Sequence, residues 1–234
     1  MTSVFFMNGF SGTYHDLRVI AHEGTHAVER QMQTRAGVLP VYASGPKFIM
    51  EALAIAAELQ LARSLYEGAA DRDLQWFFLD QLLSSKGLTI LFRTAAEAEL
   101  EEEIYDGVSR GEVRRREDLD SLTPKVFGSY GLTVPADEWT RIPLMFEDPF
   151  YDINYTFADL IALQLFAKAS SDPRGFSAAY EGALASGFDA PVDMWLKNHF
   201  GIDVRDPGLV QRGLETLRPY LDAVKTMPRS EQSR

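Results

Sequence analysis

Hydrophobic residues along much of this chain recur at the three- and four-residue spacing of amphipathic helices. The segment 157–166 is a clear case, with apolar residues at Phe157, Leu160, Ile161, Leu163, Leu165 and Phe166. Residues at this spacing share one face of a helix, where they can pack against neighbouring helices. The pattern therefore predicts that the C-terminal half is a set of packed helices.

Proline and glycine mark the expected helix boundaries. Four residue pairs place a proline, which suits the first turn of a helix, directly after a residue at the cap position: Asp148-Pro149, Asp172-Pro173, Ala190-Pro191 and Asp206-Pro207. Gly187 and Gly201 follow periodic stretches and are typical of helix ends. We therefore expect a helix to begin at each of the four pairs.

Two further helices are predicted in the N-terminal part of the chain. Thr13 and Asp16 have the spacing of a capping box, so a helix is expected from about Tyr14 to Gln33. A second, rich in alanine and leucine, should follow Ser44-Gly45-Pro46 and run to about residue 66.

The segment Ser3-Val4-Phe5-Phe6-Met7 is the one stretch that favours a strand, and the turn residues Asn8-Gly9 follow it. One short strand implies at most a small sheet. The expected fold class is therefore mainly α, with a short N-terminal strand or small sheet.

Composition and charge narrow the classes of function. The chain has 234 residues, of which 46% are hydrophobic and 24% charged, and we interpret residues 1–234 as one globular domain. A formal net charge of -11 disfavours nucleic acid and anionic lipid as partners. With no cysteine, any metal must be bound by histidine and carboxylate side chains. The sequence shows no membrane-spanning run and no secretory signal, so we expect a cytoplasmic protein.

One short segment concentrates acidic residues. It contains Glu97, Glu99, Glu101, Glu102 and Glu103. Because runs of like charge usually lie in water, we interpret these residues as a solvated helix face.

The residues that indicate chemistry are His22-Glu23-Gly24-Thr25-His26, an H-E-x-x-H motif inside a predicted helix. Positions i and i+4 share a helix face, so His22 and His26 can bind one metal ion such as zinc. Glu23 can then reach a water on that ion and take its proton during attack on a carbonyl. The alternative is a pair of ordinary histidines without a metal.

A third ligand is expected on the second helix. Glu51 lies among apolar residues, where a carboxylate needs a cationic partner, so we interpret it as a metal ligand rather than a surface carboxylate. Glu58 lies two helical turns further on and should face the same side. It could accept the second ring N–H of a ligand histidine, although a plain salt bridge is the alternative.

These residues resemble the oligoendopeptidase F and thimet oligopeptidase family of zinc metallopeptidases. In that family a glutamate ligand follows the second histidine by 25 residues, and Glu51 is 25 residues after His26. The resemblance implies one zinc ion per chain in a zincin-like helical catalytic domain. It covers nearly the whole chain, since other segments resemble the oligoendopeptidase F branch in the same order: Phe6-Met7-Asn8, Gly12-Thr13, residues 92–101, Arg141-Ile142-Pro143 and residues 149–155.

The resemblance also assigns a role to two tyrosines. It implies that Tyr151 and Tyr155 stabilise the oxyanion that develops on the scissile carbonyl. Their spacing of four residues, taken alone, favours packing in a helical core instead. The resemblance further implies that the N-terminal strand can pair with an extended peptide substrate.

Three departures from the family bear on activity. Gly24 and Thr25 stand third and fourth in the metal motif, where the family usually has glycine fourth. Leu144 replaces a family histidine that assists transition-state binding, and neither His15 nor His199 aligns with it, so we interpret both as surface or boundary residues. The sequence begins just before the metal motif, so we expect the family's helical N-terminal half to be absent, which motivates the hypothesis of a homo-oligomer.

The leading hypothesis is a zinc metalloendopeptidase that cleaves short peptides, with His22, His26 and Glu51 as ligands and Glu23 as the general base and acid. The main alternative is a weakly active or inactive zinc-binding relative that binds peptides or a protein partner. A third hypothesis is hydrolysis of a non-peptide amide or ester at the same site.

Overall fold

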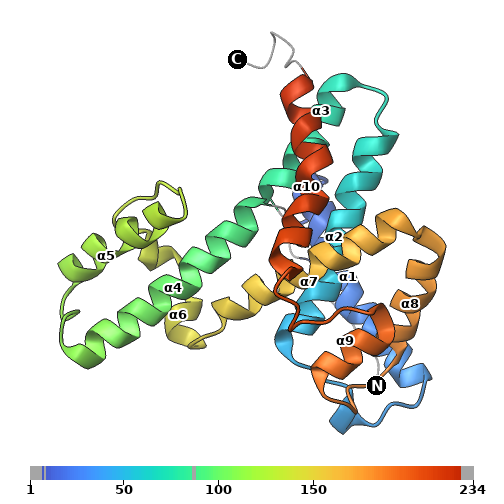
Figure 1. Cartoon of the computed structure of the whole chain (residues 1–234), viewed down its shortest axis with the longest axis horizontal. Coiled ribbons are helices and arrows are strands. Elements are labelled where there is room, and N and C mark those ends of the chain that lie inside the picture. The colour runs from blue at the N-terminus through green and yellow to red at the C-terminus, as the bar shows by residue number, and fades with distance from the viewer. Residues whose placement is uncertain (1–6, 8, 86–87, 228–234) are drawn as a thin grey trace.

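The computed structural model describes Met7, residues 9–85 and residues 88–227. All regular structure in this part of the chain is helical, which confirms the mainly α prediction (Figure 1). The predicted strand at residues 3–7 lies outside the described residues, apart from Met7. No helix among the described residues combines the length and hydropathy needed to cross a bilayer.

The longer helices are α1 (Tyr14–Arg35), α2 (Lys47–Gly68), α3 (Arg72–Asp80), α4 (Leu88–Arg110), α5 (Arg116–Ser129), α7 (Asp152–Ser171), α8 (Pro173–Ala185), α9 (Val192–Phe200) and α10 (Leu209–Thr226). Shorter helical segments are η1 (Pro40–Tyr42), η2 (Gln81–Ser85), η3 (Glu138–Arg141) and α6 (Leu144–Glu147).

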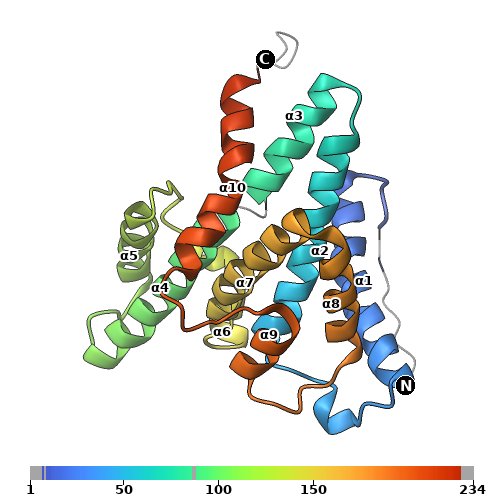
Figure 2. The same ribbon diagram turned by 45° about the vertical axis from the view of Figure 1, so that its right-hand side comes forward.

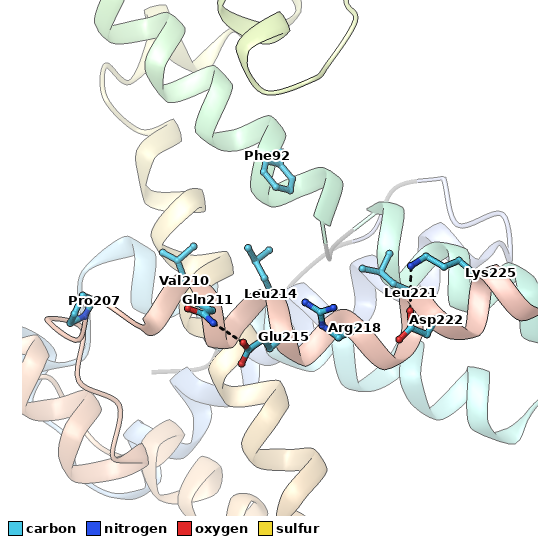
Figure 3. Close-up of a pocket in the computed structure, with 10 residues that line it drawn as sticks. All are labelled: Phe92, Pro207, Val210, Gln211, Leu214, Glu215, Arg218, Leu221, Asp222 and Lys225. Atoms are coloured by element: carbon cyan, nitrogen blue, oxygen red, sulfur yellow. Dashed lines mark hydrogen bonds and ion pairs between the residues drawn. The ribbon is translucent and has the colours of Figure 1, made fainter.

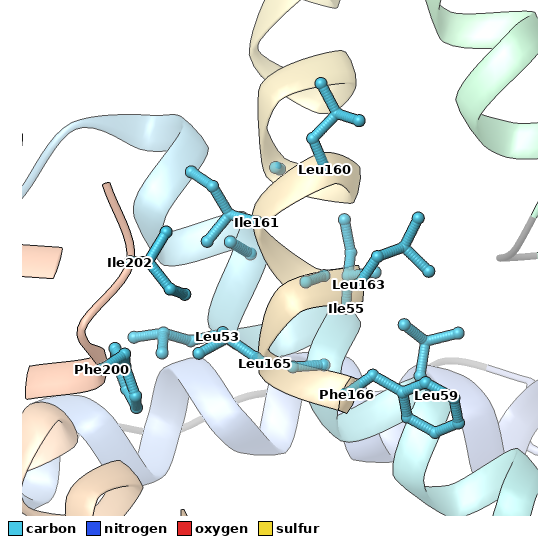
Figure 4. Close-up of a cluster of buried hydrophobic side chains, with 14 of the residues drawn as sticks. Leu53, Ile55, Leu59, Leu160, Ile161, Leu163, Leu165, Phe166, Phe200 and Ile202 are labelled. Atoms are coloured by element: carbon cyan, nitrogen blue, oxygen red, sulfur yellow. The ribbon is translucent and has the colours of Figure 1, made fainter. Parts of the chain in front are cut away.

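Helices α2 and α7 form the centre of the main hydrophobic core. Both are apolar on nearly every side, which is typical of helices buried inside a protein. Figure 4 shows their side chains meeting those of the α9 end; the buried set includes Leu53, Ile55, Leu59, Ile161, Leu163, Leu165, Phe166, Phe200 and Ile202. Burial of this apolar surface is the main contribution to the stability of the fold. The close packing of these side chains fixes the position of α2 relative to α7.

A second, smaller cluster lies to one side of the main body. Figures 1 and 2 show α4, α5 and α6 as a lobe joined to the rest through α4 and the start of α7. Its buried residues are Ala96, Leu100, Ile104, Val126, Phe127, Ile142 and Met145. The segment that precedes α7 is part of this lobe, through Ile142 and Met145.

Several predicted helix ends are confirmed. Thr13 and Asp16 form the capping box at the start of α1, and α2 begins directly after Pro46. The carboxylate of Asp172 caps α8, whose first residue is Pro173. Helix α9 begins after Pro191 and ends at Gly201, which adopts the left-handed conformation with φ 64°.

Two predicted starts are wrong. Helix α7 begins at Asp152 rather than at Pro149, because Phe150 between them has a left-handed backbone with φ 62° and cannot lie inside a helix. Helix α10 begins at Leu209, because the Asp206 carboxylate accepts a hydrogen bond from the Gly208 amide and closes a turn first.

The interpretation of the acidic segment as a solvated face is also wrong in part. Glu102 and Glu103 are exposed, but Glu101 is only 1% exposed. Burial raises the pKa of Glu97 to about 7, even though Arg93 opposes the shift. The reason is that α7 and the segment before it cover one face of α4.

A buried carboxyl group lies on α1. Glu29 is 1% exposed, and its nearest partner is the side-chain amide of Gln33, which donates to its Oε1. Glu29 Oε2 and Gln33 Oε1 are both buried without a hydrogen-bond partner. Burial raises the pKa of Glu29 to about 7, against the opposing effects of Arg30 and Gln33. The protonated form is therefore the one that suits the folded protein.

We expect Glu29→Gln to change how stability depends on pH. A raised carboxyl pKa contributes stability that is fully present below about pH 4.5 and is lost as the pH rises through 7. A glutamine avoids this loss, so the variant should gain up to about 3 kcal/mol relative to wild type by pH 8 and little at pH 4.5. Urea unfolding at both pH values measures the difference, with the exposed Glu102→Gln as the control. An equal effect of Glu29→Gln at both pH values would contradict the prediction.

Candidate metal centre

The three predicted ligands lie on two neighbouring helices. His22 and His26 are one turn apart on α1, and Glu51 faces them from the first half of α2. One donor atom from each residue lies within 4.8 Å of the others. His22 Nε2 is 3.2 Å from Glu51 Oε2, and His26 Nε2 is 3.9 Å from Glu51 Oε1. The structure therefore brings these three side chains together.

Glu58 orients the first histidine. Its carboxylate is 1% exposed, and Oε1 lies 2.6 Å from Nδ1 of His22. A carboxylate only accepts hydrogen bonds, so Nδ1 carries a proton and Nε2 is the nitrogen that faces Glu51. Arg18 donates to the other oxygen of Glu58 at 2.7 Å.

The electrostatics of the group call for a cation. Nε2 of His22 faces the carboxylate of Glu51 at close range, and Glu51 Oε2 is buried without a hydrogen bond. Burial alone would lower the pKa of His22, but Glu51 and Glu58 raise it to about 9, so without a metal ion the protonated imidazole is the cation beside Glu51. Burial lowers the pKa of His26. Two imidazole nitrogens and a carboxylate oxygen form a donor set that fits zinc or a similar transition metal.

Glu23 lies beside this group on the exposed side of α1. It follows His22 directly, and its charge raises the pKa of His26 against the larger effect of burial. The carboxylate is therefore open to solvent next to the three converging side chains.

The two predicted tyrosines lie at the start of α7, with ring centroids 5.4 Å apart. Burial raises the pKa of Tyr155, and the charge of Glu51 adds to the effect. The Nζ atom of Lys47, one turn before Glu51 on α2, lies 4.1 Å from the ring centroid of Tyr151. The start of α7 is thus placed against the part of α2 that carries Glu51.

Thr25, the fourth residue of the H-E-x-x-H motif, takes part in local hydrogen bonding. Its hydroxyl donates to the Ala21 carbonyl at 2.8 Å, and it lies beside Tyr180 of α8. Tyr180 donates to the Leu53 carbonyl at 2.6 Å. Thr25 and Tyr180 therefore link α1, α8 and α2 close to the second histidine.

His15, His199 and Leu144 are not among the converging side chains. His15 is exposed, and its Nδ1 lies 3.3 Å from the guanidinium of Arg18. His199 packs beside Trp195 with ring centroids 4.6 Å apart. Leu144 begins α6 and is partly buried in the lobe.

Two residues near the group were missed from sequence. Arg18 precedes His22 by one helical turn, so its position on the same face could have indicated a partner for Glu58. Lys47 is four residues before Glu51, but its contact with Tyr151 depends on how α7 packs. Spacing alone therefore indicates the contact of Arg18 with Glu58 but not the contact of Lys47 with Tyr151.

A groove of about 590 Å³ lies elsewhere, along α10 (Figure 3). Phe92 of α4 and the apolar residues Val210, Leu214 and Leu221 line it, together with charged residues of α10. None of the converging side chains lines this groove, so it is separate from the candidate metal centre.

Comparisons with known proteins identify similar sequences. The chain is 29% identical over 215 residues to the chromosomal oligoendopeptidase F of Lactococcus lactis subsp. cremoris, covering 88% of this chain and 35% of the relative. It is 26% identical over 233 residues to the plasmid-encoded oligoendopeptidase F, covering 97% of this chain and 38% of the relative. The chain thus spans little more than a third of the length of these relatives. No protein-family model matches it.

Solved structures share the fold. A protein described as a peptidase, from Chlamydophila abortus, has a TM-score of 0.76 at 24% identity and is matched over 94% of this chain and 37% of its own. PZ peptidase A with an inhibitor has a TM-score of 0.73 at 20% identity, over 94% of this chain and 39% of its own. The expected resemblance is therefore confirmed: over nearly all of its own length, the chain is similar to oligoendopeptidase F proteins.

Proposed function

We propose that this chain is a zinc-dependent metalloendopeptidase that hydrolyses peptide bonds in short peptides. The observation that supports this most directly is the convergence of His22, His26 and Glu51, with Glu58 orienting His22. The similarity to oligoendopeptidase F proteins supports peptide substrates. Neither a nucleic acid nor a membrane is part of this proposal, in which residues 1–234 act as one cytoplasmic catalytic domain.

In this proposal, His22, His26 and Glu51 hold one zinc ion and Glu58 keeps His22 in the tautomer that can bind it. A bound zinc ion supplies Lewis-acid chemistry, because it lowers the pKa of a coordinated water and polarises a carbonyl. Glu23 removes a proton from the attacking water and returns it to the leaving amine. Its exposed position beside the ligands suits this role.

Tyr151 and Tyr155 donate hydrogen bonds to the oxyanion that develops on the scissile carbonyl. Such a donor must keep its proton. Burial and the charge of Glu51 raise the pKa of Tyr155, which keeps the phenol protonated near neutral pH.

A second candidate function follows from Leu144. The apolar side chain stands where the resemblance places a helper histidine, and in the structure it is a partly buried residue of the lobe. A protein that kept the zinc site but had lost catalysis would bind peptides or a protein partner without cleaving them. Assembly of two copies into a homo-oligomer belongs to either function as a further hypothesis.

The role of Glu58 can be tested by metal binding alone. We expect Glu58→Gln to weaken zinc binding by about 10- to 100-fold, because the buried acceptor that fixes His22 is altered. Competition with a chromogenic zinc chelator measures the affinity. Glu67→Gln, on an exposed part of α2, serves as the control and should match wild type. An unchanged affinity in Glu58→Gln would refute this role.

The peptidase function can be tested with Glu23→Gln. We expect the variant to keep bound zinc and to lose peptide hydrolysis, because the carboxylate that accepts the proton is gone while the three ligands remain. Mass spectrometry of a pool of short peptides incubated with each zinc-loaded protein measures cleavage.

Cleavage by wild type alone supports the peptidase. Equal cleavage by both proteins excludes Glu23 as the general base. Peptides that bind to the zinc-loaded wild type but stay intact would favour the binding function instead.

A further inference from the structure

Phe150 has an unusual backbone for a residue with a side chain. Its φ is 62°, and no other described non-glycine residue has a positive φ. The Cβ atom of an L-residue crowds its own backbone in this conformation, so the conformation persists only where the surroundings impose it. Phe150 directly precedes Tyr151, the first of the two tyrosines at the start of α7.

Two residues of α4, one helical turn apart, hold this turn. The carboxylate of Glu101 accepts a hydrogen bond from the Phe150 backbone amide at 2.5 Å. The ring of Tyr105 lies against the ring of Phe150, with centroids 5.1 Å apart, and its hydroxyl donates to the Met145 carbonyl at 2.9 Å. Helix α4 therefore fixes both ends of the segment 145–150.

The other side of the turn is tied to α2. Lys47 lies 2.6 Å from the Asp148 carboxylate and 4.1 Å from the ring centroid of Tyr151. The turn therefore connects three elements: the helix that carries Glu51, the start of α7, and the buried face of α4. A shift of this turn would move Tyr151 and Tyr155 relative to Glu51.

Glu101 is costly to bury, which indicates a specific role for its side chain. It is 1% exposed, no cation is paired with it among the described contacts, and its carboxylate instead accepts the Phe150 amide. Burial raises the pKa of Glu101, and the nearby charges of Asp152 and Asp148 raise it further, so they add to the cost of keeping this carboxylate charged. A buried carboxylate among like charges is destabilising unless it makes a hydrogen bond that the structure needs.

We propose that Glu101 is a positioning residue: by holding the left-handed turn at Phe150, it places Tyr151 and Tyr155 against the metal centre. The effect on catalysis rests on the proposed function, whereas the effect on the tyrosines does not. This positioning role requires the length of the Glu101 side chain and an oxygen that accepts a hydrogen bond. It does not require the negative charge.

Two substitutions separate these properties. Glu101→Gln keeps the length and an acceptor oxygen but removes the charge. Glu101→Asp keeps the charge but is shorter by one methylene and cannot reach the Phe150 amide without movement of the backbone. Glu102→Asp, on the exposed side of the same helix, is the matched control.

The first measurement is ¹⁹F NMR of zinc-loaded protein labelled with 3-fluorotyrosine. The chain has nine tyrosines, and the signals of Tyr151 and Tyr155 are assigned from their phenylalanine variants. We expect both signals to shift in Glu101→Asp and to keep their wild-type positions in Glu101→Gln and Glu102→Asp. Unshifted signals in Glu101→Asp, or equal shifts in Glu101→Gln, would overturn the proposal.

A glycine at position 150 tests the strain directly. Glycine adopts a left-handed backbone without the Cβ clash, so Phe150→Gly should return both signals toward wild type in the Glu101→Asp background. This double variant also keeps the test decisive if Glu101→Asp alone does not fold. Signals that stay displaced in the double variant would contradict the role of the turn.

The second measurement is peptide hydrolysis. We expect Glu101→Asp to lower kcat by about 10- to 100-fold with little change in KM or in bound zinc, because the oxyanion donors are displaced while the ligands remain. Glu101→Gln should retain the wild-type kcat. A wild-type kcat in Glu101→Asp would refute the catalytic part. If wild type cleaves no peptide, the proposed function fails, and the NMR result alone decides whether Glu101 positions the tyrosines.

Discussion

The hydrogen bond between the buried carboxylate of Glu58 and Nδ1 of His22 sets the chemistry of the whole centre. It keeps a proton on Nδ1, so that Nε2 is the nitrogen that faces Glu51 across 3.2 Å. The carboxylate of Glu51 needs positive charge at this position, which is supplied either by a proton on Nε2 or by a metal ion bound to the Nε2 lone pair. Arg18 neutralises part of the Glu58 charge from the opposite side and so limits the cost of burying it.

This arrangement requires α1 and α2 to keep a constant register, and the core provides it. Glu51 and Glu58 lie two turns apart on a helix whose other faces are buried against α7. Tyr180 of α8 lies beside Thr25 of α1 and donates a hydrogen bond to the Leu53 carbonyl of α2, so it connects these helices near His26. Because α7 also carries Tyr151 and Tyr155 at its start, the same packing determines where the ligands and the tyrosines lie relative to one another.

The parts of the centre that depend on spacing within one helix could be predicted from sequence. His22 and His26 share a face because they are four residues apart, and Glu51 and Glu58 share one because they are seven apart. Thr13 and Asp172 were identifiable as caps because their hydrogen bonds are local. The ligand and catalytic roles of these residues remain proposals, although the structure places the side chains together.

The errors arose where contacts between distant segments override local preferences. Pro149 suits the start of a helix. However, Glu101, 49 residues earlier in the chain, holds Phe150 in a left-handed turn, so α7 begins only at Asp152. For the same reason the local sequence predicts a solvated Glu101, since nothing near it in the chain reveals that the segment at Phe150 and helix α7 pack against α4.

The central claim is that His22, His26 and Glu51 bind one metal ion. Its most direct test is a crystal structure of the zinc-loaded protein with an anomalous difference map at the zinc edge. The account predicts one peak at about 2.0–2.1 Å from Nε2 of both histidines and at about 2.0–2.2 Å from a Glu51 oxygen, with Glu58 still bonded to Nδ1 of His22. No peak among these three side chains, or zinc bound through Nδ1 of His22, would contradict it.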